Sequence, residues 1–257
     1  MAQGVPRTSL HASRLIRVLA ELTGADVADS RQSLGERVGQ WLDFKDAIAL
    51  YSVLHEGAPG QRHAAARAAS PAGLALHDEF IRARAALVDS INADDLPEPR
   101  KTPSRLQLAA RDAWRDGVAD FAPLQRHYLG RQRDMGASIS PLRAKARAVL
   151  AQQSASLRQL AVLDGVLDQG LGGRERTLLA TLPQLLARHF ARLHQAHVSA
   201  LAGAQAADDP DVCLQPGGWL AEFCRDMQAV LRAELDLRLQ PVAGLIEALG
   251  NEVTTQQ

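Results

Sequence analysis

The sequence LRQLAVLDGVLDQGLGGRERTLLATLPQLLARHFARLHQAHVSAL, residues 157–201, decides the fold class. Apolar residues recur in it at steps of three and four, which places them on one side of a helix. Residues 170–173, which read GLGG, break the pattern and predict a flexible corner between two amphipathic helices. The apolar positions are Leu160, Leu163, Leu167 and Leu171 before the corner, and Leu179, Leu182, Leu186, Phe190 and Leu193 after it.

The composition of the 257-residue chain favours helices over strands. Apolar residues make up 46% of it, which is ordinary for a globular protein, and aromatic residues make up only 4%. Leucine and alanine are strong helix formers, and they outnumber the β-branched residues that favour strands. We therefore expect an all-α protein, a helical bundle with long antiparallel helices.

Three prolines in residues 97–103, PEPRKTP, mark the best candidate domain boundary, because this spacing excludes a helix. We expect a smaller N-terminal helical unit over residues 1–96, a linker over 97–103, and the long-helix bundle over 104–257.

Local signals set the expected helix ends. Thr8 or Ser9 can cap a first helix that stops at Gly24, and Pro71 suits the first turn of a later one whose apolar stripe starts at Leu74. In the bundle we expect one long helix over 104–128, straight or kinked at Pro123, and then a corner flanked by Gly136 and Pro141. A thinly apolar basic helix should follow over 142–157, and a last helix should run from Trp219 and end or bend at Pro241.

The formal net charge is zero, so overall charge does not draw the protein to nucleic acid or anionic lipid. Its distribution is uneven, because residues 123–163 hold seven Lys or Arg against Asp134, and residues 204–257 hold nine acids against three Arg. One interpretation is that the two segments lie together and neutralise each other. The other is a basic face that binds an outside partner, with candidate residues Arg126, Arg131, Arg133, Arg143, Lys145, Arg147 and Arg158.

Two patterns in the central stretch resemble catalytic or nucleotide sites. Gly165 and Gly170 have the first spacing of a phosphate loop, but Leu171 stands where the lysine of that loop is required. Asp164 and Asp168 share one helix face, as a catalytic pair would, and the same spacing suits a solvated face near Arg158 or Arg174. We take the solvated face as the expectation.

A metal site is the third pattern tested. His194 and His197 could face one metal, with Cys213 and Cys224 downstream, but the two cysteines stand eleven residues apart and form no knuckle. We expect His189, His194 and His197 to be interfacial and Cys224 to be a small core residue. No nucleophile and base are found in a catalytic arrangement, so we expect no catalytic, cofactor-binding or metal residue, no cofactor, and no enzyme.

The sequence predicts neither a signal peptide nor a membrane-spanning helix. Arg7, Arg14 and Arg17 interrupt any signal-peptide core, and no stretch approaches the roughly 18–20 uncharged apolar residues that span a bilayer. Two cysteines make no disulfide framework, which fits a reducing compartment. We expect a cytoplasmic protein.

Several short runs are similar to an uncharacterised family of helical proteins of comparable length from high-GC proteobacteria, a domain of unknown function. They are VPRT at 5–8, SRQSL at 30–34, WLD at 41–43, DAIAL at 46–50, RHY at 126–128, QRDM at 132–135, VLD at 166–168, RERTLLA at 174–180, and Phe190. None is a catalytic motif, so the resemblance implies no site residues. It implies a cytoplasmic bacterial protein encoded near a coiled-coil membrane protein similar to ion-driven stator subunits and near a peptidoglycan binder similar to outer-membrane protein A.

These observations favour a non-enzymatic adaptor that binds a coiled coil or amphipathic helix of a protein partner, as an accessory to a membrane or envelope complex of the stator kind. The pattern also allows a homo-oligomer. The alternative is a helical protein that binds nucleic acid through the basic face of residues 126–158, with steeply salt-dependent affinity.

Overall fold

The computed structural model describes residues 13–24, 40–56, 71–93, 104–115, 118–204 and 210–254. These form an all-α bundle, as the composition predicts, with one short antiparallel strand pair. The elements are α1 (Arg14–Thr23), α3 (Phe44–Glu56), α4 (Pro71–Asn92), α5 (Arg105–Ala113), β1 (Trp114–Arg115), β2 (Val118–Ala119), α6 (Ala122–Ala151), α7 (Ala155–Leu179), α8 (Leu182–Ala204), α9 (Pro210–Cys213) and α10 (Trp219–Thr254).

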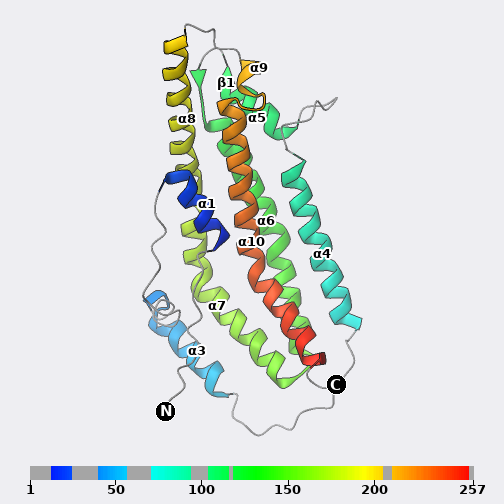
Figure 1. Cartoon of the computed structure of the whole chain (residues 1–257). Helices are drawn as coiled ribbons and strands as arrows, with labels where there is room; N and C mark the ends of the chain where they lie inside the picture. Colours follow the sequence, from blue (N-terminus) through cyan, green and yellow to red (C-terminus); the bar gives the residue numbers. More distant parts are fainter. Residues whose placement is uncertain are drawn as a thin grey trace, which may run out of the picture.

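The two longest helices, α6 and α10, lie side by side along the molecule (Figure 1). Helix α7 folds back against α6, and α8 continues from α7 along α10. Helix α4 packs along the opposite side of the α6–α10 pair, while α1 lies on α10 and α3 lies on α7. Helix α10 is therefore covered by neighbours from both halves of the chain.

The core follows the apolar stripes of the C-terminal helices. The predicted stripe from Leu179 to Leu193 is buried along its whole length. Facing it, α10 buries an apolar surface whose burial is the main force that holds the bundle together. Its fully or nearly fully buried side chains are Leu220, Phe223, Cys224, Met227, Val230, Leu231, Leu235, Leu239, Val242 and Leu245.

Helix caps agree with the sequence at several ends. Gly24 ends α1 in a left-handed conformation with φ 64°, and Ser104 forms a capping box with Gln107 at the start of α5. Pro71 is the first residue of α4. The start of α1 was predicted wrongly, because its cap is Ser13, whose side chain accepts from the backbone N–H of Ile16; Thr8 and Ser9 lie outside the described residues.

The single helix predicted over residues 104–128 is wrong. Helix α5 ends at Ala113, the chain turns through the β1–β2 pair, in which Trp114 faces Ala119, and α6 begins at Ala122. Pro123 lies in the first turn of α6, where backbone N–H groups have no partner within the helix, so the missing N–H of proline costs no hydrogen bond. Trp114, which the periodicity assigns to the helix, is buried at the strand pair.

Two predicted corners are also wrong. Gly136 and Pro141 lie inside α6, and residues 170–173 lie inside α7. The α7–α8 corner is at Ala180 and Thr181, and the predicted basic helix over 142–157 is divided where Ser154 caps α7. A glycine inside a helix costs only about 1 kcal/mol, so tertiary packing can override it.

The boundary predicted at residues 97–103 lies outside the described residues, and the division into two domains stays a prediction. Helix α4, from the N-terminal side of that boundary, packs on α6 and α10 from the other side. In the part of the chain that the structure describes, no helix has the length and apolar character needed to cross a membrane.

Candidate interaction surface

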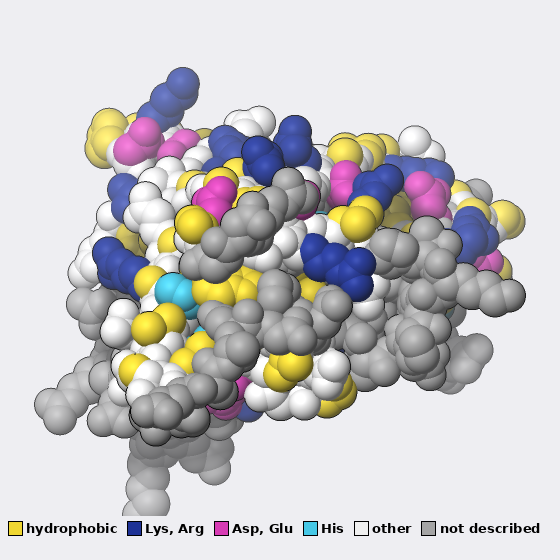
Figure 2. Space-filling view, turned by 90° about the horizontal axis from the view of Figure 1, so that it is seen from above, with side chains coloured by type: hydrophobic (Ala, Val, Ile, Leu, Met, Phe, Trp, Pro, Cys, Tyr) yellow, Lys and Arg dark blue, Asp and Glu magenta, His cyan; other side chains and the backbone are white. Residues whose placement is uncertain are grey.

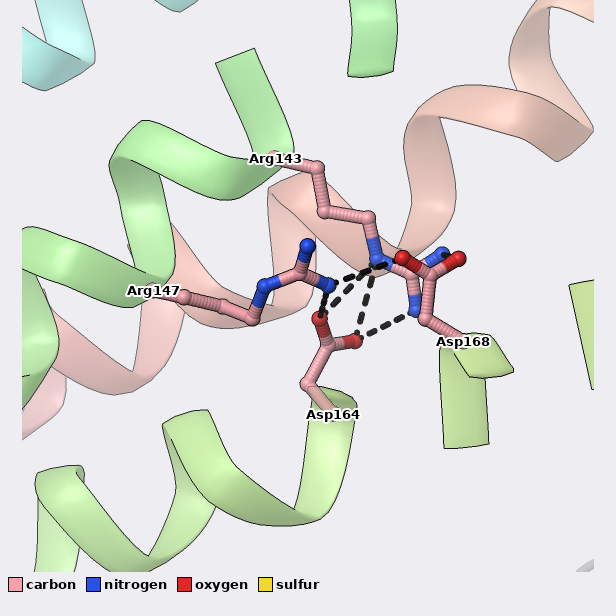
Figure 3. A network of polar contacts seen from close by, with 4 residues as sticks. All are labelled: Arg143, Arg147, Asp164 and Asp168. Carbon is pink, nitrogen blue, oxygen red and sulfur yellow. Dashed lines mark hydrogen bonds and ion pairs between the residues drawn. The ribbon is translucent and has the colours of Figure 1, made fainter. Parts of the chain in front are cut away.

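Two cations of the predicted basic face, Arg143 and Arg147, point from α6 toward α7 (Figure 3). Both contact Asp164 and Asp168. Arg143 lies 2.6 Å from Asp164 and 2.7 Å from Asp168, and Arg147 lies 3.0 Å and 2.9 Å from the same two carboxylates. Because each pair is four residues apart on its helix, two cations and two anions meet across the α6–α7 contact.

The network is largely withdrawn from water, and Asp164 is among the buried polar residues of the chain. Burial alone would lower the pKa of Arg143, but its hydrogen bond to Asp164 and the charges of Asp164 and Asp168 raise that pKa above its ordinary value. The expected solvated face at Asp164 near Arg158 or Arg174 is therefore wrong, because Arg143 and Arg147 hold it instead. Because Arg147 and Asp168 are partly exposed, the loss of one partner costs less than the roughly 3–5 kcal/mol of a fully buried pair.

The other predicted interaction residues have separate partners or stay exposed. Lys145 pairs with Glu79 of α4, and Arg131 lies 3.7 Å from Asp134. Arg133 and Arg158 are exposed and donate to the backbone carbonyls of Leu129 and Ala151, and Arg126 is exposed. At the end of the bundle that carries α9, basic side chains are interspersed with acidic ones (Figure 2). The role of these cations toward a partner stays a prediction.

The acidic C-terminal segment lies beside the basic one, as α10 lies beside α6. Its acids nevertheless pair elsewhere among the described residues: Asp236 lies 2.7 Å from Arg14 of α1, and Glu234 lies 2.7 Å from Arg238. The two segments are thus neighbours, but the ion pairs described for them lie within one segment or join it to other parts of the chain.

Glu234 is fully buried between α6 and α10. Tyr128 donates its hydroxyl proton to this carboxylate at 2.6 Å, Gln132 donates at 3.0 Å, and Arg238 donates at 2.8 Å. Burial, followed by the negative charge of Glu234, raises the pKa of Tyr128 above its usual range. The group is a satisfied core network, since each partner of the carboxylate is a donor.

His189 is buried, whereas the sequence places it at an interface. Arg192 lies 2.9 Å from its Nδ1, and Asp226 lies 2.7 Å from its Nε2. Because a guanidinium only donates, Nδ1 accepts and Nε2 carries the proton that is shared with Asp226. Cys224 is in the core as predicted.

Of the residues tested for a metal site, His197 and Cys213 are brought together, with Nε2 and Sγ 3.6 Å apart. Among the described residues no group of three His, Cys, Asp or Glu side chains is arranged to hold a metal ion.

Helix α3 has its apolar side outside. Phe44 is 82% exposed, Tyr51 61%, Leu54 54% and Ile48 50%. We define these four residues as the outer face of α3. His55 belongs to the same side, because its ring stacks on Tyr51 with centroids 3.7 Å apart. Large side chains exposed together in this way usually mark a binding surface.

The inner side of α3 is fixed on α7. A Cβ at Gly170 would lie 2.9 Å from Leu42 Cδ2 and 3.0 Å from Asp46 Oδ2, so the glycine allows the close approach. Gln159 of α7 donates to the carbonyl of Val53 at 2.9 Å. The carboxylate of Asp46 thus faces the bundle while the aromatic residues of α3 face away from it.

A model of the protein family DUF3348, proteins of unknown function, matches residues 1–251. The chain belongs to this family. The resemblance to an uncharacterised family of unknown function is thereby confirmed. Searches among curated proteins and among solved structures found no match.

The outer face of α3 in this DUF3348 protein was missed in the sequence. The spacing of Ile48, Leu50, Tyr51 and Leu54 indicates a helix, but it does not show which of these side chains stay exposed. The signal that could have revealed the surface is that apolar residues occur all round α3, which a helix lying on one neighbour cannot bury.

Proposed function

We propose that this DUF3348 protein is a non-enzymatic cytoplasmic adaptor that assembles with another chain through helix–helix contact. The observation that carries the proposal is the outer face of α3, which exposes Phe44, Ile48, Tyr51 and Leu54. Burying apolar surface is worth about 25 cal/mol per Å², so a helix laid along this face would gain from its contact with all four side chains. Helix-in-groove recognition uses anchors with this spacing.

The charged groups of the bundle support the same choice. Arg143, Arg147, Asp164 and Asp168 satisfy one another between α6 and α7. The side chains of the outer face of α3 are apolar and aromatic, and aromatic residues are enriched where protein interfaces are most buried. The resemblance described above supports a membrane or envelope complex of the stator kind as the setting.

A photo-crosslinking amino acid placed at position 51 in cells tests the proposal, with the same amino acid at position 81 as control. Ile81 of α4 is also an exposed apolar residue, 50% exposed, but it lies outside the outer face of α3. We expect a discrete crosslinked protein from position 51 and none from position 81.

Equal crosslinking from both positions would contradict the proposal. Purification of the tagged protein with and without nuclease tests the alternative, because bound nucleic acid that is lost with nuclease or with salt would favour binding through Arg126, Arg133 and Arg158.

A further inference from the structure

We propose that the chain docked on the outer face of α3 is a second copy of this protein, with the two α3 helices antiparallel. The inference rests on the proposed function, since it names the partner at the same face. Most homo-oligomers are two-fold dimers in which one patch meets itself, so the patch must be complementary to its own reversed copy.

A stripe made of three residues of the outer face of α3, together with His55, has a spacing that meets that requirement. Phe44, Ile48, Tyr51 and His55 follow one another at steps of four, three and four, which read the same in both chain directions. An antiparallel copy therefore places Ile48 opposite Tyr51 and Phe44 opposite His55. Steps of three and four are those by which side chains of paired helices interlock.

The flanks of this stripe select the antiparallel orientation. Helical geometry puts Ala47 and Leu54 along one flank and Lys45 and Ser52 along the other. In an antiparallel pair, like flanks meet, so the exposed Leu54 is covered by the apolar flank of the second copy. In a parallel pair unlike flanks meet, and Leu54 would face the flank that carries lysine.

Charge does not oppose the antiparallel pair. The pseudo-two-fold centre lies between residues 49 and 50, so the two Lys45 positions stand nine residue steps apart, about 13 Å along the helix axis. That separation exceeds the Debye length of about 8 Å at physiological ionic strength. Lys45 then lies beside the neutral Ser52 of the second copy.

A bilayer surface fits the same face less well. Helices that lie on membranes combine an apolar face with a polar face rich in Lys and Arg. The polar side of α3 carries Asp46 and is turned to α7, and the helix contributes a single lysine, Lys45. The α3 helix of a second copy can pack on this face without a polar side rich in Lys and Arg.

Sedimentation of the purified full chain over a range of concentrations tests the proposal, with Ile48→Glu as variant and Ile81→Glu as matched control. The two isoleucines are equally exposed, 50% each, so the substitutions differ in position rather than in burial. We expect a reversible dimer in the wild type and in Ile81→Glu, and a dissociation constant at least tenfold higher in Ile48→Glu, with helix content unchanged.

Cysteine crosslinking tests the orientation. Mixing the Phe44→Cys and His55→Cys proteins should give a disulfide between unlike chains in the antiparallel dimer, whereas a parallel dimer would crosslink Phe44→Cys to itself. The native Cys213 and Cys224 are buried and add little background. Self-crosslinking of Phe44→Cys would overturn the antiparallel proposal.

Two further outcomes separate this inference from the proposed function. A protein that stays monomeric, but whose position 51 crosslinks a different protein in cells, overturns the second copy and leaves the adaptor standing. A dimer that is unchanged by Ile48→Glu, with no crosslink at position 51, overturns both.

Discussion

The fold strongly changes the acidity of the Tyr128 hydroxyl. It lies fully buried and donates to Glu234 at 2.6 Å. Loss of its proton would place a phenolate beside a buried carboxylate. Burial and that neighbouring charge are the reasons for the raised pKa of Tyr128.

This raised pKa predicts a loss of stability at alkaline pH. Below pH about 10 the folded and unfolded chains both keep the Tyr128 proton, so its contribution is constant. Above that pH the unfolded chain loses the proton while the folded chain keeps it, and the free energy of unfolding falls by up to about 1.4 kcal/mol per pH unit. Urea unfolding between pH 8 and 11 should show this slope in the wild type and a shallower one in Tyr128→Phe.

The chain has two tyrosines, so Tyr51→Phe leaves Tyr128 as the single phenol and serves as the spectroscopic control. In that variant phenolate absorbance should appear only as the helices unfold. Phenolate that forms while the far-ultraviolet circular dichroism is still native would contradict the buried position of Tyr128.

The ion-pair network between α6 and α7 could be predicted only in part from the sequence. The spacings of Arg143 with Arg147 and of Asp164 with Asp168 are visible in the sequence. That these two pairs meet is not visible, because it depends on the turn between α6 and α7. The sequence prediction joined residues 142–157 in one helix and so separated the cations from their true partners.

At the scale of elements, Gly170 shows why α7 contains a glycine that does not break it. The side chains of Leu42 and Asp46 lie 2.9 Å and 3.0 Å from where its Cβ would be, whereas nothing lies within 4 Å of a Cβ at Gly173. A glycine at position 170 therefore lets the side chains of Leu42 and Asp46 approach α7 closely.

Leucine at these two positions should separate packing from helix propensity. Gly170→Leu must displace Leu42 and Asp46, and overpacking of this kind costs roughly 1–3 kcal/mol. Hydrogen exchange within α3 should become at least tenfold faster in Gly170→Leu and stay at the wild-type rate in Gly173→Leu. Equal protection of α3 in both variants would show that α3 does not depend on this contact.

Helix ends were predictable where a local group sets them. Ser104, Pro71 and Gly24 act through their own backbone or the next turn, so their roles could be read from the sequence. The corner at residues 170–173 was wrong because the local cost of glycine is smaller than the packing of α7 against α6. The real corner, Ala180 and Thr181, has neither glycine nor proline to mark it.

At the scale of the whole molecule, the N-terminal helices are part of the same packing as the long bundle. Helix α1 lies on α10, and α4 lies on both α6 and α10. Gln228 of α10 also donates to the backbone carbonyl of Ile91 in α4 at 3.3 Å. Contacts of this kind favour a single cooperative unit over the two domains predicted from the prolines at residues 97–103.

Two leucines of α4 decide between these possibilities. Leu76 is 0% exposed and Leu74 is 58% exposed, although the sequence pattern selects Leu74 for the buried stripe. Leu76→Ala should lower the free energy of unfolding by about 2–5 kcal/mol, because it removes buried contacts and leaves a cavity. Leu74→Ala should change it by less than about 0.5 kcal/mol.

The helices in which Leu76→Ala speeds hydrogen exchange distinguish one cooperative unit from two. In one cooperative unit, the most protected amides of α6 and α10 exchange only through global unfolding, so their exchange should quicken together with that of α4. If residues 1–96 form a separate unit, only α4 should lose protection while α6 and α10 keep theirs. Hydrogen exchange read by mass spectrometry on both sides of residues 97–103 distinguishes the two outcomes, because one substitution then reports on helices far from it in sequence.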